Sequence, residues 1–306
     1  MKILVMGGTR FVGKSLVAKL LNENHDIDIF TRGNNPNPEK TNLIKGDRNI
    51  FENIVKLKNK KYDLVYDISG RDLEQTKLLV DIIDNSFQRY IYVSSAGVYK
   101  DNCELPLSEA DPIDPDSRHR GKFETENWLI NQKIPFTSFR PTYIYGPGNY
   151  NKIENWFFER LFNDKSIPIP GDGSLITQLG HVSDLTDVMI RCMNYDNSKN
   201  NIYNCSGDKG VTIKGLIYFC AKVLGLNQNE ISLRTFDYQK LDPKSRKGFP
   251  IRLNHYQTDI SKIKNDLDWE PNFDLISGLK DSFMNDFKYK KGEGFDKNSD
   301  KTLFNS

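Results

Sequence analysis

The sequence predicts an α/β fold in which a doubly wound, Rossmann-type parallel sheet is joined to a smaller C-terminal α/β lobe. Three observations lead to this prediction. Five short apolar segments typical of buried strands are interspersed with three helical segments over residues 1–95. A glycine-rich turn links the first strand directly to the first helix. The 306 residues exceed the usual size of one domain, which leaves room for an additional lobe.

The first strand, residues 2–6, ends in a turn that leads into a helix over residues 14–22. Glycines let this turn approach a ligand closely, and the free N–H groups of the helix start favour an anion such as a pyrophosphate. The spacing of Gly7 and Gly13 fits the dinucleotide fingerprint, but Arg10 replaces its middle glycine. Either Arg10 turns away or pairs with the phosphate, or the turn binds a dinucleotide poorly. A turn without any ligand is the alternative interpretation.

The second strand, residues 26–30, is followed by Thr31 and Arg32. An NAD-binding fold places a carboxylate here to hold the adenosine ribose. The hydroxyl and guanidinium found instead suit a 2′-phosphate, so we expect NADP if a dinucleotide binds. A solvated loop position for Arg32 is the alternative.

The next three strands supply the remaining side chains of the predicted site. We expect strands over residues 43–48, 64–68 and 90–95, and helices over residues 50–59 and 73–84. The carboxyl ends of parallel strands meet at one edge of a sheet, where ligands bind. The predicted cofactor-binding residues at this edge are Gly7, Gly8, Thr9, Arg10, Phe11, Val12, Gly13, Thr31, Arg32, Asp47 and Ser69.

Charge and composition exclude several classes of protein. The 43 basic and 41 acidic residues leave a net charge of +2, which does not by itself imply nucleic acid binding. No apolar stretch reaches the roughly 18 residues that a membrane span needs. The four cysteines (Cys103, Cys192, Cys205 and Cys220) lack the spacing of a zinc site or a disulfide framework, and no metal ligands are assigned. Because Met1 leads straight into the first strand, we expect no targeting segment and a cytoplasmic protein.

Motifs spread over nearly the whole chain resemble those of one superfamily. They are the glycine turn and residues 92–99 (YVSSAGVY), 140–148 (RPTYIYGPG), 180–185 (GHVSDL) and 267–271 (LDWEP). In these motifs the chain resembles the extended short-chain dehydrogenases/reductases, the superfamily of nucleotide-sugar epimerases and dehydratases. The resemblance implies a Rossmann-type fold and NAD(P) binding. It implies less about activity, because function depends on the site rather than on the fold.

In that superfamily, a Tyr-x-x-x-Lys pair on a helix performs the proton chemistry, and a serine or threonine follows the fifth strand. The resemblance assigns Ser95 to the serine position and Lys122 to the lysine position, as catalytic and cofactor-binding residues. Arg118, four residues before Lys122, has no acceptor atom and cannot replace the tyrosine as a base. His119 is a candidate substitute, because histidine titrates near neutral pH. A packing or phosphate-facing histidine is the alternative.

Arg118 and Arg120 form a basic helix start, which is either a solvated end balanced by Glu124 and Glu126 or a phosphate-binding surface. Residues 6–13 (MGGTRFVG), 30–33 (FTRG), 117–126 (SRHRGKFETE) and 154–158 (ENWFF) are similar to the chloroplast stem-loop-binding proteins and their cyanobacterial relatives. That family is associated with binding and sometimes cleaving structured RNA, and with ribosomes; its members also lack the tyrosine. The resemblance implies similar partners here and, without a transit peptide, a cyanobacterial-type homologue.

Two domains and a tail are expected. Residues 1–150 with 175–206 are predicted to form the dinucleotide-binding domain, residues 151–174 with 207–289 the C-terminal substrate or RNA lobe, and residues 290–306 a polar tail that frays. In the lobe we expect helices over 155–162 and 213–224, a strand over 231–236 and a loop over 167–173. Its basic run, Lys244, Arg246, Lys247 and Arg252, is assigned to phosphates of RNA or of a substrate, with a solvated face as the alternative.

The leading hypothesis is an RNA-binding protein on an NAD(P)-binding epimerase/dehydratase fold, with a metal-assisted endoribonuclease activity using Mg as an extension. One alternative is an NADP-dependent nucleotide-sugar epimerase or reductase. Another is a catalytically silent, NADP-sensing scaffold with a vestigial cofactor site. We expect a homo-oligomer or a complex with a paralogue, and no membrane partner.

Overall fold

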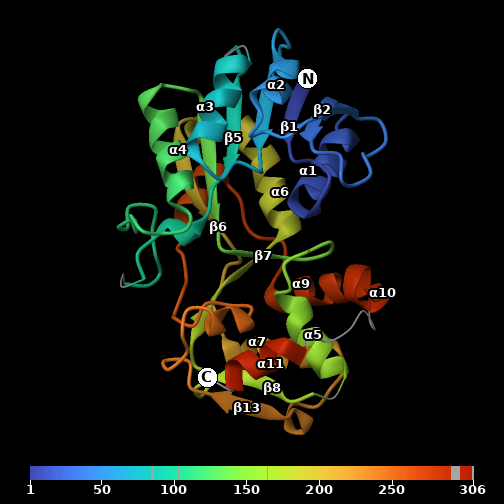
Figure 1. Cartoon of the computed structure of the whole chain (residues 1–306), viewed down its shortest axis with the longest axis vertical. Helices are drawn as coiled ribbons and strands as arrows, with labels where there is room; N and C mark the ends of the chain where they lie inside the picture. The colour runs from blue at the N-terminus through green and yellow to red at the C-terminus, as the bar shows by residue number, and fades with distance from the viewer. Residues whose placement is uncertain (84–85, 102–103, 164, 291–296, 305–306) are drawn as a thin grey trace. The chain divides into compact units, whose positions relative to one another are not determined.

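The structure is a computed structural model that describes residues 1–83, 86–101, 104–163, 165–290 and 297–304 (Figure 1). It divides into two compact units. Unit 1 comprises Met1–Thr142, Val182–Cys205 and Thr258–Glu270, and unit 2 comprises Tyr143–His181, Ser206–Gln257 and Pro271–Ser306. Each unit contains a hydrophobic core of its own.

Unit 1 is built on a seven-stranded sheet with the order β11-β6-β5-β4-β1-β2-β3, in which every neighbouring pair is parallel. The predicted Rossmann-type, doubly wound fold is confirmed. The strands are β1 (Lys2–Met6), β2 (Asp26–Thr31), β3 (Asn42–Lys45), β4 (Leu64–Asp67), β5 (Arg89–Val93), β6 (Phe136–Pro141) and β11 (Asn201–Cys205).

Helices cover both faces of this sheet because its strands are apolar on both sides. On one face, α2 (Phe51–Ile54), α3 (Leu73–Ile82) and α4 (Arg120–Asn131) share a core with side chains of β1, β4 and β5. On the other face, α1 (Phe11–Asn22) packs against α6 (Val182–Arg191). Lys19 of α1 joins these two helices by hydrogen bonds to the carbonyl and hydroxyl oxygens of Ser183, each 2.8 Å long.

The segment Thr258–Glu270 belongs to unit 1, although the sequence analysis assigned it to the C-terminal lobe. Its helix α8 (Ser261–Leu267) contacts β11. The Tyr203 hydroxyl donates to Asp266 Oδ2 at 2.9 Å, and Lys262 Nζ donates to Asn201 Oδ1 at 3.0 Å. These contacts with the last strand of the sheet explain why the chain returns to unit 1 so late in the sequence.

Unit 2 combines helices α5 (Glu154–Phe162), α7 (Ile213–Val223) and α9 (Leu275–Ser282) with three small sheets. β8 (Ile167–Pro170) is parallel to β13 (Leu233–Phe236), β7 (Tyr143–Tyr145) is parallel to β10 (Leu179–His181), and β9 (Ile176–Thr177) is antiparallel to β12 (Val211–Thr212). The predicted loop over residues 167–173 is therefore wrong for its first four residues. Their two prolines lack an N–H, but Ile167 and Gly171 donate the hydrogen bonds to the neighbouring strand.

The predicted fraying tail is wrong where the structure describes it. A π-helix, η7 (Phe283–Phe287), leads into α10 (Lys288–Lys290), and a further helix, α11 (Lys297–Phe304), follows residues 291–296, which lie outside the described residues. Leu303 of α11 is buried in the core of unit 2, and Asp300 lies 2.9 Å from the guanidinium of the fully buried Arg160. Two apolar side chains at its end, Leu303 and Phe304, and one ion pair anchor a helix whose other residues are polar.

Three of the cysteines, Cys192, Cys205 and Cys220, are buried free thiols, whereas Cys103 lies outside the described residues. Burial raises the pKa of the Cys192 thiol to about 12. None of the helices in the described ranges combines the length and apolar character that crossing a membrane requires.

Candidate functional site

The glycine turn between β1 and α1 is shaped by two glycines that no other residue could replace without distortion. Gly7 has a φ of +100°, and a Cβ added to it would lie 3.0 Å from the Cβ of Ser69. A Cβ added to Gly13 would lie only 2.2 Å from the carbonyl oxygen of Gly7. The turn, the start of α1 and the chain after β4 therefore meet as closely as a dinucleotide cradle requires.

Arg10 is compatible with this turn although the fingerprint has glycine there. Its backbone is extended, with φ −138° and ψ 147°, and its carbonyl accepts the N–H of Gly13 at 2.9 Å. Any residue can adopt this conformation, and the Arg10 side chain is exposed. Besides Gly7, the residue of the turn with a positive φ is the buried Phe11, at +38°. Replacing the middle glycine by arginine thus costs no backbone strain.

The predicted adenosine side of the site lies at the ends of β2 and β3. Arg32 is exposed after β2, and Asp47 follows β3 at the same edge of the sheet. The pKa of Asp47 is lowered, first by the N–H of Asn49, which donates to its carboxylate at 2.9 Å, and further by the charges of Arg32 and Arg48. Asp47 is therefore an anion beside an arginine at the carboxyl edge.

A buried ion pair that the sequence analysis did not identify supports this edge. Arg48 makes two parallel hydrogen bonds to Asp67, from Nη1 to Oδ1 at 2.6 Å and from Nη2 to Oδ2 at 2.9 Å. The Tyr90 hydroxyl also donates to Asp67, at 2.7 Å. Burial would raise the pKa of Asp67, but the charge and hydrogen bonds of Arg48 outweigh it and hold the pKa below its usual value. In the sequence, the one feature that could have indicated this pair is Asp67, an aspartate at the end of an apolar strand.

This ion pair orients Ser69, which was predicted to bind cofactor. Arg48 Nη1 donates to Ser69 Oγ at 2.8 Å, and the N–H groups of Ser69 and Gly70 donate to Asp67 Oδ1 at 3.2 and 2.9 Å. Because Ser69 Oγ accepts from a guanidinium, its own proton remains for another acceptor. The structure places this hydroxyl beside the glycine turn, next to Gly7.

Lys122 of α4 reaches the same edge, as predicted from its position in the superfamily motif. Its Nζ donates to the carbonyl oxygens of Val93 at 2.6 Å and Gly70 at 3.0 Å, and thereby joins the ends of β5 and β4. Burial lowers the pKa of Lys122 to about 8, although the carboxylates of Asp67 and Glu126 act in the opposite direction. Lys122 therefore holds the main chain at this edge, and the pKa of its amine lies close to neutral pH.

The remaining predicted catalytic residues lie just before α4 and after β5. Helix α4 begins at Arg120, two residues later than the predicted start, so Arg118 and His119 precede it. Arg118 Nε donates to His119 Nε2 at 3.0 Å, which occupies the lone pair that a general base would use. Ser95 Oγ accepts the N–H of Gly97 at 3.1 Å and caps a short 3₁₀ turn, η2 (Ala96–Val98). Arg120 is exposed and forms an ion pair with Glu124 at 3.0 Å.

Neither of the two buried tyrosines closest in the chain to Ser95 can replace the missing phenol. Tyr92 donates to the carbonyl of Gly70 at 3.3 Å, and burial raises its pKa well above the usual value. Tyr99 donates to Asn204 Oδ1 at 2.7 Å, and burial raises its pKa to about 12. A tyrosine can act as a base at neutral pH only if its pKa is lowered, whereas the pKa values of both of these tyrosines are raised.

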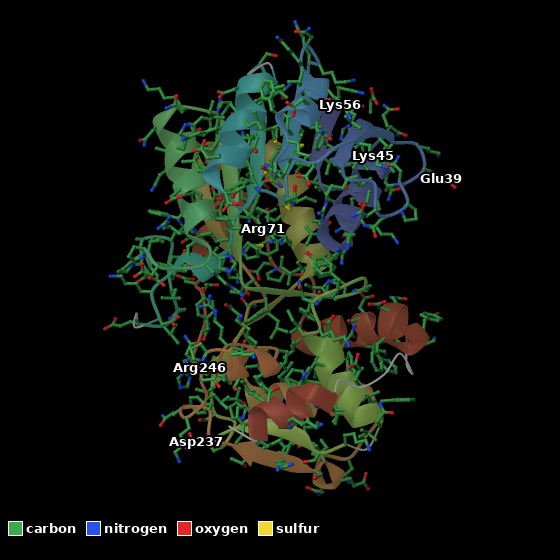
Figure 2. The ribbon with its side chains drawn as sticks, viewed as in Figure 1. Glu39, Lys45, Lys56, Arg71, Asp237 and Arg246 are labelled. Carbon is green, nitrogen blue, oxygen red and sulfur yellow. The ribbon has the colours of Figure 1, made fainter. Side chains whose placement is uncertain are left out.

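The basic run of unit 2 surrounds a short 3₁₀ turn, η6 (Ser245–Gly248). Lys244, Arg246 and Lys247 are exposed, and Figure 2 shows Arg246 at the surface. Phe249, which follows them, is buried against Trp156 and Phe236, at ring-centroid distances of 5.3 and 5.6 Å. An aromatic anchor therefore holds a cationic turn at the surface.

Arg252, the fourth predicted phosphate residue, lies further along the same segment of unit 2. Its guanidinium stacks over the ring of Tyr256 at 4.4 Å, and its N–H donates to the Tyr143 hydroxyl at 2.8 Å. It is half-buried, unlike the three exposed cations of the turn. In the part of the chain that the structure describes, no group of three or more His, Cys, Asp or Glu side chains could hold a metal ion.

A parallel sheet whose carboxyl edge carries a glycine turn, a helix start and polar strand ends defines the class of Rossmann-type dinucleotide-binding proteins. Within that class, the chain belongs to the NAD dependent epimerase/dehydratase family, whose model matches residues 3–206.

Relatives in this family differ in what their names describe. The chain is 41% identical over 305 residues to the chloroplast stem-loop binding protein of 41 kDa b of Arabidopsis thaliana. The aligned region covers 94% of this chain and 79% of that protein. It is 26% identical to a putative UDP-glucose 4-epimerase of Methanocaldococcus jannaschii, over 91% of this chain and 96% of the relative. The resemblance to the stem-loop-binding proteins is thus confirmed.

Solved structures confirm the fold. A UDP-glucose 4-epimerase from Thermotoga maritima with UDP-glucose superimposes with a TM-score of 0.79 at 18% identity, covering 95% of this chain and 99% of that one. A UDP-glucuronic acid 4-epimerase from Bacillus cereus in complex with NAD gives a TM-score of 0.74 at 18% identity, covering 95% of this chain and 100% of the other.

Proposed function

We propose that the protein binds structured RNA on an epimerase/dehydratase fold that keeps an NADP-type dinucleotide site but lacks the usual proton chemistry. The observation that carries this proposal is Arg118 at the tyrosine position, with its guanidinium donating to His119 at 3.0 Å. A guanidinium cannot accept a proton, and it occupies the acceptor nitrogen of the candidate substitute base. The 41% identity to a protein named for stem-loop binding supports RNA as the partner.

The residues present fit a dinucleotide. Gly7 and Gly13 leave the space that a Cβ would fill, and Thr31 and Arg32 offer a hydroxyl and a cation suited to a 2′-phosphate. Ser69 and Lys122 would contact the cofactor further along the edge. NADP supplies hydride transfer in reductases, but here the groups around it only bind and orient it.

RNA would be bound through phosphates by exposed cations. Arg118 and Arg120 in unit 1 and Lys244, Arg246 and Lys247 in unit 2 are all exposed, and Arg252 is half-buried. Among the five exposed cations, Arg120 forms an ion pair with Glu124, and within the described residues the other four form none. Cations without such partners can exchange their counterions for phosphates, which gives a salt-dependent affinity.

Filter binding of a stem-loop RNA across a salt series tests this proposal. We expect salt-dependent binding, and we expect Arg246→Gln with Lys247→Gln to flatten the slope of log affinity against log salt by about one per residue. Lys199→Gln with Lys222→Gln removes two exposed lysines elsewhere and serves as the matched control. A dissociation constant no better than millimolar at low salt would refute RNA binding.

A nucleotide-sugar epimerase or reductase is the second candidate. It is favoured by the placement of Lys122 at the carboxyl edge, as in the superfamily motif, and by the 26% identical relative named as a putative UDP-glucose 4-epimerase. This function predicts that Ser95→Ala and Lys122→Ala abolish turnover. If no sugar nucleotide is turned over or oxidised with bound cofactor, the candidate is dropped.

A further inference from the structure

The edge strand β3, the helix α2 and the 3₁₀ turn η1 (Val55–Leu57) that follows it lie in the most basic stretch of unit 1. Residues 39–61 contain seven basic and three acidic side chains, a net charge of +4 against +2 for the whole chain. One of the seven, Arg48, is buried in its pair with Asp67, and the other six are exposed lysines. The rest of the molecule is therefore slightly acidic, and positive charge is concentrated here.

Large apolar side chains are exposed in the same stretch. Leu43 is 42% exposed, Ile50 46% and Phe51 55%. Ile54 of α2 and Leu57 of η1 are buried in the core of unit 1, whereas Phe51, at the start of α2, stays at the surface. We define the β3–α2 surface by Leu43, Lys45, Ile50, Phe51, Lys56 and Lys58.

As far as the structure describes the chain, the lysines of this surface have no acidic partner, and one of them binds the main chain of another. Lys56 Nζ donates to the carbonyl oxygen of Lys45 at 2.8 Å, so the Lys56 amine lies at the end of the strand. Figure 2 shows Lys45 and Lys56 along the same side of unit 1. Within the described residues, Lys45, Lys56 and Lys58 form no ion pair, unlike Lys60, which lies 3.7 Å from Asp28.

Protection of a sheet edge explains only part of this arrangement. Lysines at an edge strand discourage pairing with another chain. Edge protection gives no reason for an exposed phenylalanine and isoleucine beside them, because apolar groups at an edge promote association. Exposed aromatic rings among unpaired cations are instead the combination that binds single-stranded nucleic acid, in which bases stack and phosphates are neutralised.

We propose that the β3–α2 surface binds unpaired nucleotides of RNA, with Phe51 stacking on a base and Lys45 and Lys56 contacting phosphates. This inference rests on the proposed RNA binding and names the kind of RNA segment that the protein takes. RNA suits the surface better than an acidic protein segment, since it supplies a regular line of negative charge together with flat bases.

Fluorescence anisotropy with two RNA probes tests the proposal on the 306-residue chain. One probe is a stem-loop with about eight unpaired nucleotides, and the other is a duplex of the same stem without a loop. We expect Phe51→Ala to weaken stem-loop binding about five-fold or more without changing the salt slope, and to leave duplex binding unchanged. Phe51→Trp should restore the affinity, because the indole also stacks.

The lysines give an independent readout. Lys45→Gln with Lys56→Gln should reduce the salt slope by about 1.4, or about 0.7 for each lost contact with single-stranded phosphate. Ile130→Ala, which truncates a 48% exposed isoleucine on α4, is the matched apolar control and should have no effect.

Two outcomes would overturn the proposal. In the first, the wild type binds the stem-loop, but the Phe51 and lysine variants keep its affinity and slope. In the second, Phe51→Ala changes only the oligomeric state measured by sedimentation, which would identify the surface as a contact between protein chains. A wild type that binds neither probe would instead refute the proposed function itself, together with this extension of it.

Discussion

Lys122 is a buried amine held by two main-chain acceptors. Its amine donates to Val93 and Gly70 carbonyls at 2.6 and 3.0 Å, and burial lowers its pKa from the usual 10.5 to about 8. The folded protein therefore releases this proton at lower pH than the unfolded chain does. Both hydrogen bonds survive, because a neutral amine still carries two hydrogens.

A pH dependence of stability follows from this shift. Between pH of about 8 and 10.5, the unfolded chain binds the Lys122 proton and the folded protein does not, so the free energy of unfolding should gain up to about 1.4 kcal/mol per pH unit from this group. We expect Lys122→Met to remove that contribution, measured by urea unfolding across this range. Lys199→Met, at an exposed site, should leave it intact. Parallel pH profiles for wild type and Lys122→Met would contradict the assignment.

Gly13 offers a second test at the residue scale. A Cβ added there would meet the Gly7 carbonyl oxygen at 2.2 Å and Ile68 Cδ1 at 2.6 Å. We expect Gly13→Ala to lower the free energy of unfolding by about 1–3 kcal/mol and to abolish NADPH binding measured by calorimetry. Gly215→Ala in α7 of unit 2 is the control, because its new methyl would meet only side-chain atoms of Thr212 and Val211, at 3.0 Å. A Gly13→Ala protein that keeps the stability and the NADPH affinity of the wild type would show that the turn tolerates a side chain.

The sequence could predict those parts of the site that depend on residues close together in the chain. The glycine turn is local, so its spacing alone indicated that Gly7 and Gly13 approach a ligand. The pair of Arg48 and Asp67 could not be predicted, because its members are 19 residues apart and meet only after β4 joins the sheet. The engagement of His119 by Arg118 likewise depends on how the chain turns before α4.

At the scale of elements, the C-terminal helix α11 is the clearest case of tertiary contacts overriding local composition. Its residues 297–304 have no apolar period, so the sequence predicted a frayed tail. Leu303 nevertheless enters the core, and Arg234 stacks over Phe304 at 3.7 Å. Strand β8 is a second case. Its two prolines made the sequence look like a loop, and it is a strand because it pairs with β13, which lies far away in the chain. The large parallel sheet was predictable because its strand-and-helix alternation repeats within neighbouring residues.

The ion pair between α11 and α5 predicts a measurable contribution to stability. Asp300→Ala would leave the Arg160 guanidinium, which is fully buried, without its carboxylate partner at 2.9 Å. We expect a loss of about 1–3 kcal/mol in the free energy of unfolding, measured by chemical denaturation. Lys301→Ala, one residue later and exposed, should change it by less than about 0.5 kcal/mol. An Asp300→Ala protein as stable as this control would mean that α11 contributes no such anchor.

At the scale of the whole molecule, the net charge is small but the charged residues are distributed unevenly along the chain. The chain carries +2 overall, yet residues 39–61 carry +4. The same part of unit 1 contains Arg32 and Asp47, the residues expected to hold the adenosine end of NADP. The proposed nucleotide site and the proposed RNA surface are therefore neighbours along the carboxyl end of β3.

This proximity predicts that NADPH and RNA oppose each other. The phosphates of a bound NADPH would add negative charge beside Lys45 and Phe51, so RNA should bind more weakly when the dinucleotide site is filled. We expect saturating NADPH to weaken stem-loop binding about five-fold or more in filter assays, and RNA to weaken NADPH binding by the same factor, because the coupling is reciprocal. The nicotinamide should remain reduced throughout, since no base is placed for its chemistry. Gly13→Ala is the control, because it should abolish NADPH binding without changing any charge, so NADPH should then have no effect on RNA binding. RNA affinity that is identical with and without saturating NADPH would show that the two ligands bind independently.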